Sequence, residues 1–188
     1  MTSQQARRRA EIFAATGEAG QDGRFRTSAT VGERRMLGDV LGAQRATLEM
    51  KCAGLTGELA LRSVAPSTLS LLGLVRHLTD MERRWFRRAL AGQDAPALFS
   101  SAERPDDDFD GAVADPAVIA GAWRAWRAEV EFSDRFAAEA SGLDLVGEDS
   151  WRGPVSLRWV LLHMIEEYAR HNGHADLLRE RIDGAIGV

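Results

Sequence analysis

Residues 155–184 of the 188-residue chain read VSLRWVLLHMIEEYARHNGHADLLRERIDG, and this stretch indicates a helical fold. Its apolar side chains recur every three or four positions, which is the period of an α-helix that buries one face. They are Leu157, Val160, Met164, Ala175, Leu178 and Ile182. Gly184 is the last residue of this stretch, and glycine commonly ends a helix at the residue after its last turn. We therefore predict one long helix from about residue 155 to residue 183.

Three earlier segments show the same period. Apolar positions predict helices over about residues 33–54, 66–92 and 115–142, and the third begins with an Asp-Pro pair suited to capping a helix. No segment alternates with a period of two, so no sheet is expected. The economical architecture is all-α, a four-helix bundle, in which the polar segment 93–114 forms a long crossover connection. The acidic run Asp106–Asp108 in that connection is interpreted as a solvated loop rather than a cation site.

The composition bounds the class of protein. A chain of this length forms one domain, which we place at residues 31–188, after a flexible N-terminal arm at residues 1–30. The net charge of −4 and the pI near 5.6 argue against nucleic acid as a partner. No run approaches the roughly 20 apolar residues that span a bilayer, so no membrane is expected. The single cysteine, Cys52, excludes an internal disulfide and suits a reducing cytoplasm, and we interpret it as a small core residue.

Two polar side chains fall inside the apolar stripe of the last predicted helix. Glu167 and His171 lie one turn apart in that stripe, whereas His163 and His174 lie at its edge. A buried carboxylate is costly unless a hydrogen bond or a metal compensates it. The i and i+4 spacing lets both side chains reach one point, as paired metal ligands on a helix do. A charge-assisted hydrogen bond without a metal is the alternative.

The fourth histidine supplies a third donor. His77 follows Leu74 by three positions and precedes Met81 by four, so it borders the inward face of the second predicted helix. Alone it would be interpreted as a core histidine with a hydrogen-bond partner. Together with Glu167 and His171 it forms two imidazoles and one carboxylate, a set typical of catalytic zinc sites, with nickel and iron as alternatives. His163 and His174 remain candidates for an outer hydrogen-bond partner, a proton carrier or a replacement ligand.

Two segments carry a family resemblance. SLLGLVRHLTDMERRWFRRAL and HMIEEYARHNGHADLLRERIDG resemble the DinB-like four-helix metalloproteins of bacteria, and more narrowly an actinobacterial branch, over about residues 33–184. The resemblance implies a four-helix bundle with a long crossover and a metal triad in which His77 is the first ligand and His171 the last. Many members have His where this chain has Glu167. The related mycothiol-dependent maleylpyruvate isomerases are similar to this chain in using Glu there.

The resemblance also implies a function. Such proteins are often metal-dependent enzymes that use mycothiol, bacillithiol or glutathione, so we expect a cytoplasmic, homodimeric thiol S-transferase or isomerase with a divalent metal, zinc first. Mycothiol would be the cosubstrate and a small electrophile the substrate, and His174 or His163 would carry the proton. Two alternatives stay open: a non-catalytic metal or small-ligand binding protein, and a structural, stress-related dimer with a buried polar network.

Overall fold

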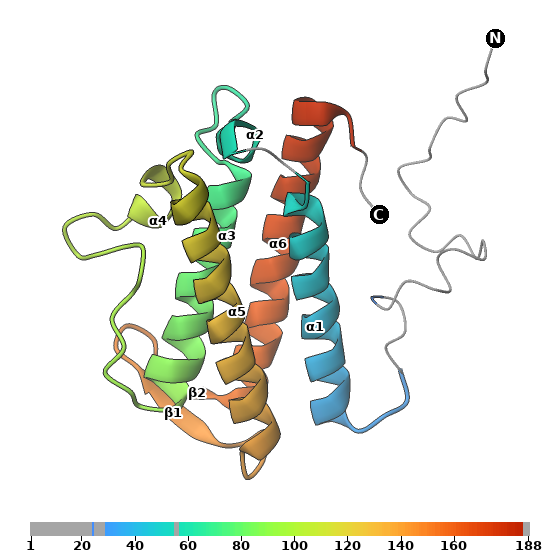
Figure 1. The fold of residues 1–188 in the computed structure, drawn as a ribbon. Helices are drawn as coiled ribbons and strands as arrows, with labels where there is room; N and C mark the ends of the chain where they lie inside the picture. Colours follow the sequence, from blue (N-terminus) through green and yellow to red (C-terminus); the bar gives the residue numbers. More distant parts are fainter. Residues whose placement is uncertain (1–23, 25–28, 55–56, 186–188) are drawn as a thin grey trace.

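The helix that the C-terminal pattern predicts is the longest element of the computed structural model, which describes Arg24 and residues 29–54 and 57–185. In chain order, the elements are α1 Glu33–Cys52, α2 Gly57–Leu61, α3 Leu71–Glu82, η4 Arg83–Leu90, α4 Asp107–Asp110, α5 Pro116–Glu139, β1 Val146–Asp149, β2 Gly153–Ser156 and α6 Leu157–Asp183 (Figure 1). The π-helical η4 continues α3 without a break, so the two form one long rod. Nearly all of the predicted N-terminal arm lies outside the described residues, and its flexibility stays a prediction.

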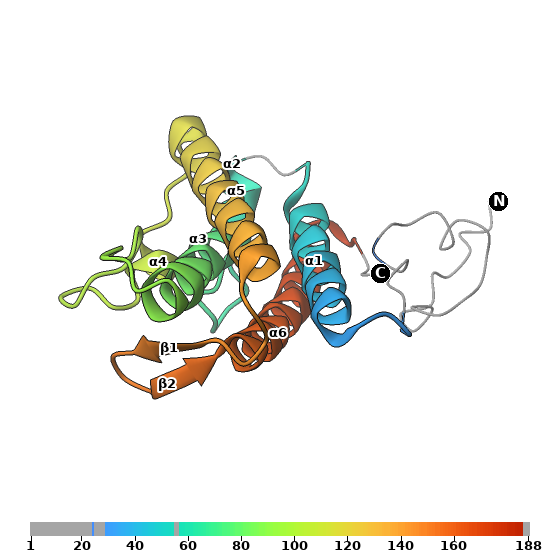
Figure 2. The ribbon, with the colours of Figure 1, turned by 90° about the horizontal axis from the view of Figure 1, so that it is seen from below.

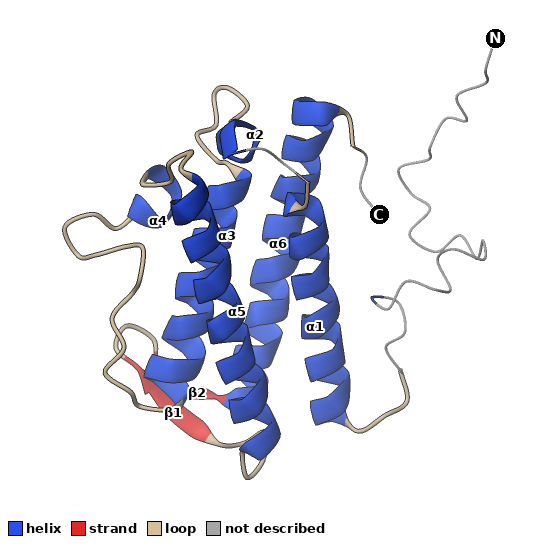
Figure 3. Ribbon diagram, viewed as in Figure 1, coloured by secondary structure: helices blue, strands red, loops and turns tan. Residues whose placement is uncertain are grey.

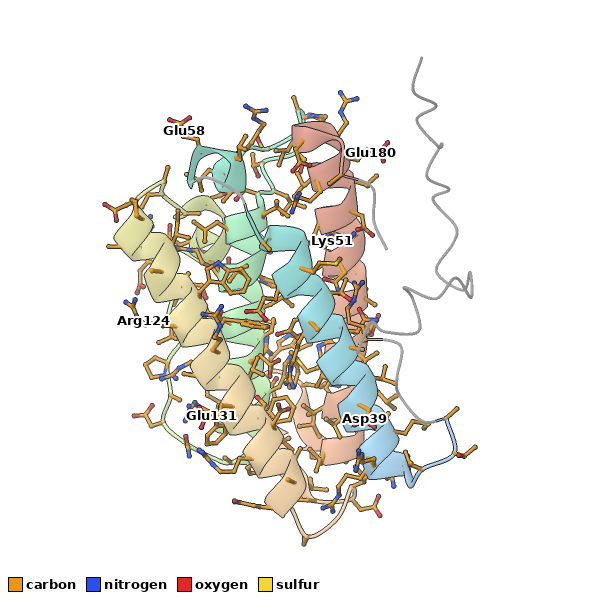
Figure 4. All side chains as sticks on the ribbon, turned by 45° about the vertical axis from the view of Figure 1, so that its right-hand side comes forward. Asp39, Lys51, Glu58, Arg124, Glu131 and Glu180 are labelled. Carbon is orange, nitrogen blue, oxygen red and sulfur yellow. The ribbon has the colours of Figure 1, made fainter. Side chains whose placement is uncertain are left out.

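Four long helical rods form the bundle, as the sequence predicts. Helix α1 packs along α6, and α3 packs on both α5 and α6, while the crossover carries the short α4 along the outside of α3 (Figures 1 and 2). The interior is filled by fully buried apolar side chains, including Leu41, Leu78, Phe86, Leu161 and Met164. Charged side chains such as Arg124 and Glu131 project outward from α5 (Figure 4). The prediction of an all-α four-helix bundle is confirmed.

Side-chain caps fix where two of the helices begin. Asp115 accepts hydrogen bonds from the backbone N–H groups of Ala117 and Val118, at 2.7 and 3.2 Å, so the predicted start of α5 is confirmed. The second helix begins later than the sequence predicts, because Ser70 caps it by accepting from Gly73 N at 3.1 Å. In each case the cap gives a partner to N–H groups that the first turn of a helix leaves unpaired.

The expectation of no sheet is wrong. Strands β1 and β2 form a two-stranded antiparallel hairpin in which Val146 pairs with Ser156 and Asp149 with Gly153, shown in red in Figure 3. Each strand has only four residues, and their sequences, VGED and GPVS, do not alternate apolar with polar side chains. The hairpin lies against η4 so closely that a Cβ at Gly147 would come within 2.0 Å of the Ala89 carbonyl oxygen. This close approach requires glycine.

Asp149 ties the hairpin to the bundle. Its carboxylate accepts two hydrogen bonds from the Arg84 guanidinium, at 3.0 and 2.9 Å, and two more from the backbone N–H groups of Trp151 and Arg152. The hydrogen bonds from Arg84, more than any other contact, lower the pKa of Asp149 to about 2. The ionised carboxylate therefore stabilises the folded chain.

We expect Asp149→Asn to reduce the free energy of unfolding by about 2 kcal/mol at pH 7. A carboxyl whose pKa is lowered in the folded state contributes fully above its unfolded pKa of about 3.8 and loses that contribution as the pH falls through its folded pKa of about 2. The difference from wild type should thus shrink to about half by pH 3. Urea unfolding at the two pH values measures it. Glu148→Gln, which changes the exposed neighbour, serves as the control, and a pH-independent difference would contradict the assignment.

Candidate metal centre

Helices α3 and α6 bring the three predicted ligands together. His77 on α3 and Glu167 and His171 on α6 each offer a donor atom, and these atoms all lie within 4.8 Å of one another. His171 Nε2 is 3.4 Å from Glu167 Oε2, and the His77 and His171 rings meet edge to face with their centroids 4.8 Å apart. The helical spacing of Glu167 and His171 aims both side chains at α3. The arrangement is a compact set of two imidazoles and one carboxylate.

The set is accessible from one side. The side chains of His77 and Glu167 are 15% and 18% exposed, whereas that of His171 is 9% exposed and forms the inner wall. A cavity of about 420 Å³ adjoins His77 and is bordered by Met81 and Arg84. This volume lies within the range of small-molecule sites. A larger cavity of about 830 Å³ lies between α1 and α5, but none of the three side chains borders it.

The charge state of Glu167 suits cation binding. The hydrogen bond from His171 is the main cause that lowers the pKa of Glu167, and the nearby His163 and His77 add to it. Burial acts in the opposite direction but does not outweigh them. Glu167 is therefore an ionised carboxylate at neutral pH, in a place where an uncompensated charge would be costly.

A buried carboxylate lies next to His77, although the sequence predicted it to be solvated. Asp108, from the acidic run, is only 4% exposed, and its Oδ2 lies 2.8 Å from His77 Nδ1. The interpretation of that run as a solvated loop is wrong for this residue. The missed signal is Phe109, because an apolar ring directly after three aspartates marks a segment that packs. The Phe109 ring stacks on His77 with the centroids 4.4 Å apart.

His174 stands behind His171. Its Nδ1 lies 3.3 Å from Nδ1 of His171, within hydrogen-bond distance, while His171 Nε2 lies 3.4 Å from Glu167 Oε2. Burial lowers the pKa of His174, and the neighbouring His171 lowers it further, which favours the neutral ring. His174 therefore lies next to His171, and its role as an outer partner, a proton carrier or a ligand stays a prediction.

His163 lies beside the set on the solvent side. Its Nε2 is 3.8 Å from Glu167 Oε1, and its ring stacks on Trp159 with the centroids 4.7 Å apart. Trp85 meets the same ring edge to face. Burial is the main cause that lowers the pKa of His163. Glu167 and Glu166 act in the opposite direction, and the positive charges of Arg152 and Arg84 add to the effect of burial. The lowered pKa favours the neutral ring.

Cys52 does not belong to this site. It packs among core side chains at the end of α1, with its Sγ 4.0 Å from the Leu71 carbonyl oxygen. Burial raises the pKa of its thiol to about 12. The thiolate form is therefore negligible at neutral pH, which agrees with a core role.

An α-helical bundle with one inward histidine on its second long helix and Glu-x-x-x-His on its last belongs to the DinB-like class. The family model described as mycothiol-S-transferase matches residues 36–184, and the chain belongs to that family. A search of curated proteins finds no match. No described helix is long and apolar enough to cross a bilayer.

Comparison with solved structures supports the fold independently. The crystal structure of a conserved protein from Enterococcus faecalis matches 82% of this chain and 99% of its own chain, with a TM-score of 0.57. The two sequences are 17% identical, so the similarity concerns the fold alone. The family match confirms the resemblance of the two histidine-bearing segments to the DinB-like family.

Proposed function

We propose that this protein is a divalent-metal-dependent enzyme that uses mycothiol to modify a small electrophilic substrate, by S-transfer or by isomerisation. The observation that carries the proposal is the convergence of His77, Glu167 and His171 in a chain of the mycothiol-S-transferase family. Zinc is the first choice of metal, and nickel and iron are the alternatives, because all three accept imidazole and carboxylate ligands.

The three side chains fit such a cation. Bonds of about 2 Å allow two ligand atoms on one ion to lie up to about 4 Å apart. Separations of at most 4.8 Å would therefore need only a small contraction, and the half-buried Glu167 has room to make it. Three protein ligands leave further coordination positions for a thiol or a substrate. Of the three side chains, His77 borders the cavity of about 420 Å³.

In this proposal the cation, His163 and His174 have different roles. A divalent cation held there would lower the pKa of a thiol sulfur, so that mycothiol is presented as a thiolate at neutral pH. His163 would accept the thiol proton and return it to the product, because its lowered pKa favours the neutral ring and its Nε2 lies 3.8 Å from Glu167 Oε1. His174 supports His171 from behind and keeps its Nε2 facing inward.

Cobalt substitution tests the proposal directly. Metal-free protein is loaded with Co²⁺ and titrated with mycothiol, and a sulfur-to-cobalt charge-transfer band is expected to grow and saturate at one thiol per site. Bacillithiol and glutathione are titrated in parallel. Transfer to a panel of electrophiles is then followed by mass spectrometry, with zinc-loaded and metal-free protein compared.

The outcomes separate the three classes of function. If the protein takes up no metal, and its stability does not change when zinc, nickel or iron is added, the structural alternative is favoured. Metal uptake without turnover of any thiol and electrophile pair would favour a non-catalytic binding protein. We also propose a cytoplasmic homodimer, and the mass of the protein from light scattering tests the dimer.

A further inference from the structure

We infer that the crossover segment is a positioning element for His77: Asp108 fixes the His77 ring in its Nδ1–H tautomer before any ligand arrives. The inference deepens the proposed function and rests on it only where metal binding is concerned. The juxtaposition that carries it is the 2.8 Å contact between His77 Nδ1 and Asp108 Oδ2, made across 31 residues of sequence.

The direction of this hydrogen bond follows from the chemistry of its partners. An ionised carboxylate only accepts hydrogen bonds, so the proton must lie on His77 Nδ1. The lone pair of the neutral ring is then on Nε2, the nitrogen that remains for Glu167 and His171. An imidazole without a fixed partner places its proton on Nε2 for much of the time and would block this position.

Asp108 is held rigidly enough to impose this choice. Arg76, the residue before His77, donates from Nε to the Asp108 carbonyl oxygen at 2.9 Å and from Nη2 to the Asp107 carbonyl oxygen at 2.6 Å. The other Asp108 oxygen, Oδ1, accepts from Phe109 N at 2.9 Å. The Phe109 ring then stacks on His77, so the same turn holds both the edge and one face of the imidazole.

The backbone of α4 approaches α3 closely at this point. A Cβ at Gly73 would lie only 3.2 Å from the Phe109 carbonyl oxygen, closer than ordinary van der Waals contact. Glycine at position 73, one turn before His77, therefore lets Phe109 and Asp108 reach the ring. A larger side chain there would push the turn away from His77.

A second buried carboxylate anchors the other end of the crossover. Asp80, one turn after His77, is 3% exposed and accepts from the backbone N–H groups of Leu98, Phe99 and Ser100 and from the Ser100 hydroxyl. Arg76 also lies over the Phe99 ring at 4.6 Å. The crossover is thus bound to α3 on both sides of His77. These contacts hold it in place although most of its residues form no regular secondary structure.

The tautomer can be measured without metal. Full-length protein with ¹⁵N-labelled histidine is examined near pH 8 by long-range ¹H–¹⁵N correlation, and the His77 signals are identified by their loss in His77→Gln. Wild type is expected to show the Nδ1–H form. Asp108→Ala should shift most of the His77 population to the Nε2–H form, and Asp108→Asn, which keeps the size and a weaker acceptor, should give a mixture.

Asp110→Ala is the matched control, because it removes an exposed carboxylate from the same short helix. Its His77 tautomer should equal that of wild type. Zinc affinity, measured by competition with a chromophoric chelator, should fall about 10- to 100-fold in Asp108→Ala and stay within about twofold in Asp110→Ala. Signals of the other three histidines report whether each variant is folded.

The inference would be overturned by His77 in the Nε2–H form in wild type, or by a His77 tautomer that does not change when Asp108 is removed. A tautomer change with unchanged zinc affinity would also overturn it, because the contact would then not serve the site. Wild-type protein that binds no metal but shows the Nδ1–H form contradicts the proposed function and leaves the role of Asp108 at His77 supported. The two failures are therefore distinguishable.

Discussion

The zinc affinity of His171→Ala is expected to lie at least about 100-fold below that of wild type, beyond the loss that removal of an outer partner usually causes. The substitution removes one of three ligands and also removes the hydrogen bond that does most to lower the pKa of Glu167. The remaining carboxylate and His77 cannot surround a cation. Competition with a chromophoric chelator at neutral pH measures the change, and thermal unfolding of the metal-free variant checks that it is folded.

His174→Ala provides the matched control, because it removes an imidazole one turn away whose Nδ1 is 3.3 Å from that of His171. Because His174 only supports a ligand, its removal should lower the zinc affinity about tenfold. Equal losses in the two variants would show that His174 is itself a ligand and that the assignment of the triad is wrong. His163→Ala should leave zinc affinity nearly unchanged and lower turnover.

The largest effect on stability is expected for Glu82→Ala, at about 3–5 kcal/mol of the free energy of unfolding. Glu82 is fully buried and accepts hydrogen bonds from Arg45 Nε and Nη2, both at 2.7 Å. Its oxygens also accept from the hydroxyls of Ser133, at 2.6 Å, and Tyr168, at 2.9 Å. Removal of the carboxylate leaves the Arg45 guanidinium in the core without its main counter-ion, and urea unfolding at pH 7 measures the cost.

The double variant Arg45→Met with Glu82→Leu should recover most of that loss, since apolar side chains of similar size often replace a buried ion pair without penalty. A double variant as unstable as Glu82→Ala would show that packing, and not the unpaired charge, causes the effect. The network also bears on the site, because Tyr168 follows Glu167 directly and its hydroxyl fixes the rotation of α6 against α3.

Local sequence was sufficient for the parts of the site that lie on one helix. The positions of Glu167 and His171 follow from the helical period alone, because residues four apart on one helix always share a face. His77 was assigned from its spacing to Leu74 and Met81, which orients it toward the core of the bundle. The start of α5 and the end of α6 were also predictable, since Asp115 and Gly184 act within one turn of the helix that each caps.

The parts that sequence reasoning missed depend on contacts between distant segments. Phe109 indicates that its segment packs, but nothing near Asp108 in the chain indicates that it packs beside His77. The two strands of the hairpin are short and do not alternate apolar with polar side chains. The start of α3 was placed too early because several hydroxyl residues precede it and only the folded chain selects Ser70 as the cap.

The four helices, the inward direction of His77, Glu167 and His171, and the kind of donors they offer follow from local sequence patterns. The folded chain is needed to show that these donors meet within 4.8 Å, that His174 lies next to His171, and that Asp108 contacts His77. The physical reason is that a hydrophobic period fixes the direction of a side chain about its own helix axis. It carries no information on which segment packs against that face, because the apolar contacts that join the helices are not directional.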